Sequence, residues 1–301
     1  MDNATYEGQT LRGSGRLVDY SNLVKLPHTV FALPFALVGA TLASYRYPLR
    51  PAHLVWILLA FTSARFAAMG FNRIVDRAID ARNPRTRGRE IPAGKLSVRQ
   101  ASVAVAAASA LFLFSAARLN TLCLVLAPFA LGWIFLYSYT KRFTRWAHLV
   151  LGFALAIAPV GAYLAVSGEW SRPAGGLLAL AGAVLCWVAG FDILYSLQDE
   201  SFDREQGLYS VPATFGARGA IWISRGLHVC CVALFVVAGL LFPETGWLYE
   251  AGVGLIAAML VYEQSLVRAD DLSRIDAAFF NINGAISLVF MGIVFVERML
   301  A

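Results

Sequence analysis

Charged residues are scarce in this 301-residue chain: they make up 15% of it, against about 25% in an ordinary soluble domain. Hydrophobic residues make up 58% and come in long runs. This composition excludes an intrinsically disordered protein and a soluble nucleic-acid-binding protein. The sequence therefore predicts an all-α, polytopic membrane protein, because a chain in lipid must satisfy its backbone polar groups internally.

Cysteine is also scarce, and the four residues lack the paired spacing of zinc sites or disulfide frameworks. All four lie inside apolar runs, and we interpret them as small buried hydrophobic residues: Cys123, Cys186, Cys230 and Cys231. Residues 1–20 contain no apolar stretch of the kind found in signal peptides. The first spanning helix is therefore expected to direct the chain to the membrane.

Long apolar segments recur along the chain, each close to the roughly 20 residues that a helix needs to cross a bilayer. They predict nine transmembrane helices, and Pro34, Pro128 and Pro159 lie inside them, as membrane helices tolerate. A capping box of Ser97 and Gln100 marks the start of the third helix. The expected spans are residues 29–45, 53–71, 97–117, 119–139, 144–166, 174–198, 217–242, 247–267 and 275–296.

Basic residues are distributed unevenly between the two sides of these spans. Of the 25 Lys and Arg residues, 18 fall on the side that holds the N-terminus and 5 on the other. Such an excess marks the cytoplasmic side, so the C-terminus is expected outside. The net charge of +6 then reflects this bias or a phosphorylated substrate, and no nucleic-acid partner is expected. We expect one membrane domain over residues 1–301, with residues 1–27 as a cytoplasmic or interfacial segment.

The stretch just before the first span, residues 16–27, alternates apolar and charged residues. It predicts either a short interfacial helix or a frayed extension of the first span.

Two acid-rich segments lie on the expected cytoplasmic side, after the second and the sixth spans. The first carries Asn72, Asp76 and Asp80, and the second carries Asp199 and Asp203. A spacing of four residues places side chains on one helix face, about 5–6 Å apart at Cβ. Carboxylates that close repel each other unless a divalent cation shares them. The offset of four helices between the segments indicates two similar halves whose acidic helix ends face each other.

The ligand types in these segments favour Mg²⁺ together with a diphosphate, because Mg²⁺ is usually held by one or two carboxylates plus substrate phosphates. Basic residues on the same side should then contact the phosphates. Arg65 lies two turns deeper than Asn72, where a charge is costly unless it faces a polar interior. Lys25, Lys141 and Arg142 lie at helix ends on that side. The histidines lack the spacing of metal ligands, and we interpret them as interfacial or packed residues: His28, His53, His148 and His228.

These motifs resemble those of the UbiA superfamily of intramembrane aromatic prenyltransferases. That family has N-x-x-x-D-x-x-x-D after its second helix and D-x-x-x-D after its sixth, which match residues 72–80 and 199–203 here. Residues 89–97, 137–142 and 192–199 are similar to three further family stretches, so the resemblance covers about residues 25–297. Arg73 and Glu90 depart from the pattern, and neither occupies a metal-ligand position.

The resemblance implies a UbiA-type bundle that transfers a polyprenyl group from a prenyl diphosphate to an aromatic hydroxy acid, with Mg²⁺ as cofactor. Within that family, the sequence is most similar to the 4-hydroxybenzoate polyprenyltransferase group. Residues 28–37 and 72–85 are also similar to the branch proposed for the futalosine route to menaquinone, whose acceptor would be 1,4-dihydroxy-6-naphthoate. The acceptor, the choice between ubiquinone and menaquinone biosynthesis, and the prenyl chain length stay open.

Residue roles also follow from the resemblance. It implies that Mg²⁺ bridges the diphosphate to Asn72, Asp76, Asp80, Asp199 and Asp203. It implies that the remaining phosphate charge is neutralised by Lys25, Arg65, Lys141 and Arg142. Asp192, deeper in the sixth span, would help to deprotonate the phenol. The expected location is the inner (cytoplasmic) membrane, with the site toward the cytoplasm, the lipid bilayer as its surroundings and no obligatory protein partner.

Other classes account for parts of the pattern. Relatives of the same fold that act on haem, homogentisate or chlorophyllide stay open. A secondary transporter also uses intramembrane acids and two halves, but it predicts acids near the middle of the bilayer. The chain has no Asp-Gly dipeptide, which excludes the D-G-x-x-A-R signature of CDP-alcohol phosphotransferases. A soluble prenyl-diphosphate synthase is excluded by the hydropathy and by the lack of D-D-x-x-D.

Overall fold

The computed structural model describes residues 15–25, 32–170 and 174–301. This part of the chain is helical and has no β-strand beyond an isolated bridge between Arg268 and Asp271, which confirms the all-α prediction. The elements are α1 (Arg16–Leu23), α2 (Leu33–Ala43), α3 (Pro51–Arg82), α4 (Val98–Leu119), α5 (Thr121–Thr140), α6 (Ala147–Ser167), α7 (Ala174–Ser196), η2 (Leu197–Asp199), α8 (Glu200–Glu205), α9 (Val211–Leu241), α10 (Trp247–Leu266), η3 (Ala277–Ile282) and α11 (Asn283–Leu300).

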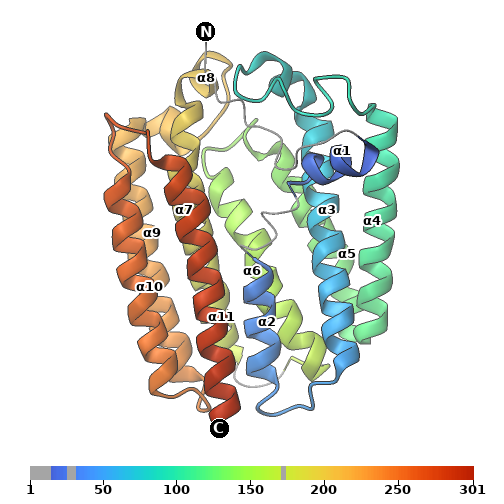
Figure 1. Cartoon of the computed structure of the whole chain (residues 1–301), viewed down its shortest axis with the longest axis vertical. Coiled ribbons are helices and arrows are strands. Elements are labelled where there is room, and N and C mark those ends of the chain that lie inside the picture. Colours follow the sequence, from blue (N-terminus) through green and yellow to red (C-terminus); the bar gives the residue numbers. More distant parts are fainter. Residues whose placement is uncertain (1–14, 26–31, 171–173) are drawn as a thin grey trace.

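The longer helices run side by side along the long axis of the molecule (Figure 1). Within the described ranges, seven helical segments are long and apolar enough to cross a membrane. The predicted count of nine is therefore not confirmed. Helix α2 is apolar but has only 11 residues, and α10, which carries Glu250 and Glu263, is not among the seven. The bundle exposes large apolar side chains on its outside, as a lipid-facing surface requires: Phe129, Trp222, Leu240 and Trp247.

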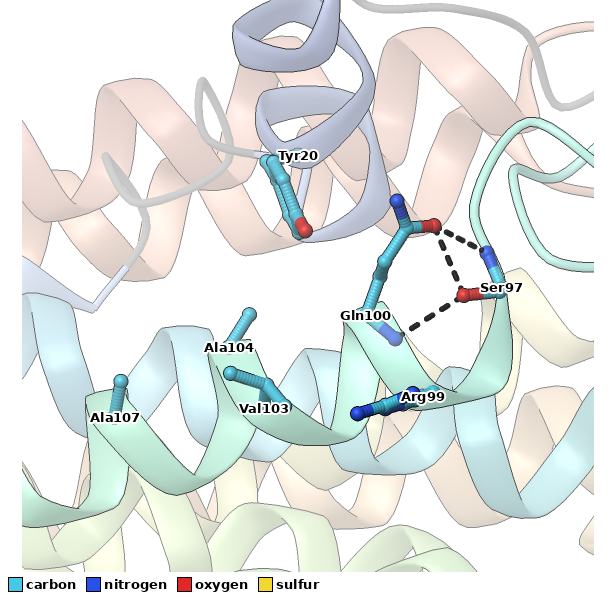
Figure 2. Close-up of a pocket in the computed structure, with 7 residues that line it drawn as sticks. All are labelled: Tyr20, Ser97, Arg99, Gln100, Val103, Ala104 and Ala107. Atoms are coloured by element: carbon cyan, nitrogen blue, oxygen red, sulfur yellow. Dashed lines mark hydrogen bonds between the residues drawn. The ribbon is translucent and has the colours of Figure 1, made fainter.

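Polar side chains set the starts of helices α4 and α5. The predicted capping box begins α4: Ser97 Oγ accepts from the Gln100 backbone N–H at 3.2 Å, and Gln100 Oε1 accepts from the Ser97 N–H at 2.9 Å (Figure 2). Asn120 caps α5 by accepting from the Cys123 N–H at 2.9 Å. The same amide donates to the Leu164 carbonyl of α6 at 2.9 Å, so one side chain ties the start of α5 to the end of α6.

Glycines allow the central helices to approach closely. A Cβ on Gly39 of α2 would lie 2.0 Å from the carbonyl oxygen of Pro159 in α6, and one on Gly152 of α6 would lie 2.4 Å from that of Leu185 in α7. The largest buried cluster is formed where α2, α6, α7, α9, α10 and α11 meet, and it includes Trp187. Pro128 and Pro159 lie inside α5 and α6, and Pro34 lies in the first turn of α2.

The two ends of the bundle differ. Helices α1 and α8 and the loop between α3 and α4 gather at one end, and the C-terminal end of α11 lies at the other (Figure 1). The stretch predicted as residues 16–27 forms a separate helix, α1, over its described part, whereas residues 26–31 lie outside the described ranges. Helix α9 begins at Val211, before the predicted residue 217. A kink at Gly216, with φ 70°, separates its first turn from the rest of the helix, which starts at the predicted position.

Candidate active site

The first acid-rich segment lies on the last turns of α3, a 32-residue helix that continues well beyond the predicted end at residue 71. Asn72 Nδ2 donates to Asp76 Oδ2 at 2.8 Å, so the four-residue spacing does bring these two side chains together. Asp80 is 4% exposed, and its Oδ2 is buried without a hydrogen-bond partner among the described residues. A buried acceptor of this kind is suited to a cation or to a further hydrogen-bond donor.

The second acid-rich segment does not lie on one continuous helix, and this expectation was wrong. Helix α7 ends at Ser196, Asp199 lies in the 3₁₀ turn η2, and Asp203 lies in the short helix α8. Both carboxylates are nevertheless buried. The 3₁₀ turn interrupts the regular helix, so the two acids lie on two successive elements.

The loop after α3 connects the two acid-rich segments. Asn83 Nδ2 donates to Asp199 Oδ1 at 3.0 Å, and the Arg85 guanidinium binds both oxygens of Asp199, with Nε to Oδ1 at 3.0 Å. Arg85 Nη1 also donates to the Tyr195 hydroxyl at 3.3 Å. From the same loop, Arg89 Nη1 lies 2.6 Å from Asp80 Oδ1.

The end of α5 makes a second connection. Lys141 Nζ lies 3.4 Å from Asp203 Oδ2, and the next residue, Arg142, places Nη2 3.0 Å from Asp76 Oδ1. Burial disfavours the charged form of Lys141, but the nearby carboxylates outweigh it and raise the pKa of this amine. Lys141 therefore stays protonated at neutral pH, and adjacent residues on one helix end contact both acid-rich segments.

Asp192 lies on α7, below the acid-rich end. Its Oδ2 is 2.6 Å from Nδ1 of His148, a 1%-exposed residue in the first turn of α6. The Val211 N–H, at the start of α9, faces His148 Nε2 at 3.4 Å. The interpretation of His148 as a packed residue was therefore incomplete, because it also contacts a predicted catalytic side chain.

The two remaining predicted phosphate ligands are Arg65 and Lys25. Arg65 lies within α3, and its Nε is buried without a hydrogen-bond partner in the described part of the chain. Lys25 follows α1, is 8% exposed and has a left-handed backbone with φ 45°. A charged side chain inside a bundle is costly unless it faces a polar group or an anion, so the role of Arg65 as a phosphate ligand stays a prediction.

Within the described ranges, no three Asp, Glu, His or Cys side chains are close enough to hold a metal ion together. Instead, four carboxylates are paired with four basic side chains. The donor set still suits Mg²⁺, which prefers carboxylate and amide oxygens, and Asp80 Oδ2 is a buried acceptor still lacking a partner. The residues therefore fit a magnesium site in which carboxylates change partners from basic side chains to the ion.

One open groove of about 570 Å³ lies elsewhere, between α1 and α4 (Figure 2). Tyr20 of α1 faces Gln100 and Ala104 of α4 across it, and none of the acidic residues of the site line it. The groove is therefore lined by other residues than the ion pairs, although α1 and the start of α4 lie at the same end of the bundle as α8.

Several residues of the site were missed by sequence reasoning: Asn83, Arg85, Arg89, His148 and Tyr195. Three of them follow the first acidic motif within one loop, and that proximity was the available signal. Their partners lie more than 100 residues away in the case of Asn83 and Arg85, and no local spacing reveals such contacts.

The fold and the site together define a helical membrane protein with paired acidic and basic residues at one end of its bundle. The sequence profile of the UbiA prenyltransferase family matches residues 32–285. The chain therefore belongs to this family of prenyltransferases.

Known proteins give the same result. The chain is 30% identical to a 4-hydroxybenzoate octaprenyltransferase of Nitrosospira multiformis, over 93% of this chain and 95% of that protein. It is 29% identical to a mitochondrial 4-hydroxybenzoate polyprenyltransferase of Aedes aegypti, over 80% of this chain but only about half (54%) of that protein.

Solved structures share the fold. A UbiA homolog from Aeropyrum pernix K1, in its apo form, is 36% identical with a TM-score of 0.81, covering 90% of this chain and 98% of that one. A UbiA homolog from Archaeoglobus fulgidus, bound to DMAPP and Mg²⁺, is 22% identical with a TM-score of 0.73. The comparison covers 94% of this chain and 100% of that one. At that identity, the second comparison supports the fold alone.

Proposed function

We propose that the protein transfers a polyprenyl group from a prenyl diphosphate to the ring of an aromatic hydroxy acid, with Mg²⁺ as cofactor. The observation that carries this proposal is the cluster of four ion pairs at one end of the bundle. Asp76, Asp80, Asp199 and Asp203 each contact a basic side chain from another segment. A site with these acidic and basic side chains can bind metal ions through its carboxylates and phosphates through its guanidinium and ammonium groups.

Charge balance supports a metal diphosphate as the ligand. The four carboxylates and the four basic side chains that they contact cancel in charge, which limits the cost of burying them. A diphosphate with its magnesium ions is nearly neutral as a unit. It can therefore enter by exchange, with the carboxylates turning to the ions and the basic side chains turning to the phosphate oxygens.

The proposed roles follow from this exchange. The residues that would hold Mg²⁺ are Asn72, Asp76, Asp80, Asp199 and Asp203. When bound, the ion would supply Lewis-acid stabilisation of the leaving diphosphate. The residues that would bind the diphosphate oxygens are Lys25, Arg65, Lys141 and Arg142, to which the structure adds Arg85 and Arg89 as neighbours of the same carboxylates. Arginine is suited to this task because its planar guanidinium can donate hydrogen bonds to two phosphate oxygens at once.

The chemistry is a substitution at an allylic carbon. The carbon–oxygen bond to diphosphate breaks, and the electron pair leaves with the diphosphate, where the basic side chains stabilise the developing charge. The allylic cation then bonds to the ring carbon next to the phenolic oxygen. Asp192 Oδ1 accepts the phenolic proton as this bond forms. Loss of the ring hydrogen and return of the proton to oxygen restore the aromatic phenol, so the net release is one proton and one diphosphate.

The acceptor is proposed as 4-hydroxybenzoate, the substrate that the names of the bacterial and insect relatives carry. The alternative is 1,4-dihydroxy-6-naphthoate, which also has a ring carbon ortho to a phenolic hydroxyl. We also propose that the acid-rich end faces the cytoplasm, in the cytoplasmic membrane, because the basic residues gather at that end.

The test uses the full chain, purified in detergent or nanodiscs with Mg²⁺. A prenyl diphosphate is supplied with 4-hydroxybenzoate or with 1,4-dihydroxy-6-naphthoate, and products are identified by mass. We expect the mass of one acceptor plus one prenyl group, one diphosphate per product, and no product in EDTA. Asp199→Asn should abolish turnover, whereas Asp271→Asn, a matched change in an exposed loop, should not. Release of diphosphate without a prenylated ring would overturn the proposal.

A further inference from the structure

His148 and Asp192 form a partly buried pair that the binding of diphosphate does not use. His148 lies in the first turn of α6 and Asp192 in α7, and Nδ1 and Oδ2 are 2.6 Å apart. The histidine is 1% exposed and the Asp192 side chain is 19% exposed. One member of the pair is thus enclosed by protein, and the other is open on one side.

The tautomer of His148 is set by the backbone of α9. The Val211 N–H can only donate, and it points at His148 Nε2 at 3.4 Å, so Nε2 is the acceptor nitrogen. The proton then resides on Nδ1 and is donated to Asp192. His148 therefore lies between the Val211 N–H and the Asp192 carboxylate, with Nδ1 as the nitrogen that donates to Asp192.

The hydrogen bond leaves the second oxygen of Asp192 available. Oδ2 is occupied by His148, and no donor to Oδ1 is found among the described residues. Tyr137 on α5 and Lys141 just after it are titratable groups that couple electrostatically to Asp192. Lys141 in turn contacts Asp203, so Asp192 lies next to the acid-rich end without belonging to its ion pairs.

We propose that His148 is a positioning residue for Asp192: its Nδ1–H fixes Oδ2, so that Oδ1 faces the hydroxyl group of the aromatic acceptor. This inference rests on the prenyl transfer proposed above. Rotation of the carboxylate about its Cβ–Cγ bond would otherwise spread Oδ1 over several directions. A fixed carboxylate takes the phenolic proton in the geometry that the transition state needs, and a general base contributes about 10²–10⁴-fold to rate.

The test compares three changes. His148→Leu removes the donor and keeps the site apolar, His148→Gln keeps one N–H donor and one acceptor, and His228→Leu removes another buried histidine that does not contact Asp192. We expect His148→Leu to lower kcat by about ten- to a hundredfold, a part of the general-base contribution, with little change in the KM for prenyl diphosphate. His148→Gln should recover most of this loss, and His228→Leu should not show it.

The pH profile separates positioning from folding. A donor to a carboxylate stabilises its ionised form, so its removal in His148→Leu should move the acidic limb of the kcat profile to higher pH. The effect of His148→Leu should also vanish when Asp192→Asn is already present. An unshifted acidic limb, or an equal loss in both backgrounds, would overturn the inference. If the unchanged protein prenylates neither acceptor, the proposed function itself has failed, which is a different outcome.

Discussion

The ion pair between Arg89 and Asp80 gives the most informative single perturbation of the site. The two side chains are 13% and 6% exposed, and Arg89 Nη1 lies 2.6 Å from Asp80 Oδ1. Arg89→Met keeps the length of the side chain but removes its charge. Breaking a buried pair by removing one partner costs about 3–5 kcal/mol, because it leaves an uncompensated buried charge.

This cost predicts a measurable loss of thermal stability. At about 2 °C per kcal/mol for a chain of this size, Arg89→Met should unfold about 6–10 °C below the unchanged protein in EDTA. Mg²⁺ should then stabilise the variant more than the unchanged protein, because a cation can replace the missing guanidinium at Asp80. At ten times its Kd, the ion would contribute about 1.4 kcal/mol, or about 3 °C.

The assay is thermal unfolding of purified protein in detergent, with EDTA or with a series of Mg²⁺ concentrations. Arg87→Met, an exposed position in the same loop, is the matched control and should change the Tm little. The double variant Asp80→Asn with Arg89→Met should recover stability and lose the response to Mg²⁺. Equal Tm values for Arg89→Met and the unchanged protein in EDTA would refute the stabilising role of the ion pair. A variant without any Mg²⁺ response would refute Asp80 as a metal ligand.

Further outcomes follow from other contacts. Asp76→Ala and Asp199→Ala should each abolish prenyl transfer while the protein stays folded by size-exclusion chromatography; near-normal turnover in either would contradict their roles. Arg65→Lys keeps the positive charge but loses the bidentate hydrogen bonding of the guanidinium, so in steady-state kinetics the KM for prenyl diphosphate should rise while the KM for the acceptor does not. Asn283→Leu removes hydrogen bonds to Trp187 and Glu263, at 2.7 and 2.8 Å, and should cost about 2–4 kcal/mol in unfolding experiments, whereas Glu263→Gln should be tolerated. An unchanged Tm in Asn283→Leu would show that this buried network contributes little.

The helical fold was predictable because hydropathy reports directly on helices that face lipid. Hydropathy did not report where each helix ends. Helix α3 continues as a helix to Arg82 although its apolar stretch stops near residue 71, since a helix needs hydrogen bonds and not lipid to persist.

The two acidic motifs show where a spacing argument holds and where it fails. Asn72 and Asp76 lie four residues apart on a regular helix, and they do contact each other. Asp199 and Asp203 have the same spacing, but the 3₁₀ turn after Ser196 separates them into two elements. Spacing alone could not distinguish the two cases, because both segments consist of residues that a helix end accommodates.

The basic partners of the acids explain why the site can exist before any ligand binds. Four carboxylates at one end of a bundle would repel one another, and the sequence suggested only a cation as the remedy. The structure provides a second one: Arg85 and Arg89 come from the loop after α3, and Lys141 and Arg142 from the end of α5. Each carboxylate therefore has a basic partner that a diphosphate can take over. It follows that metal and diphosphate should bind cooperatively, since either one alone would leave half of these charges without partners.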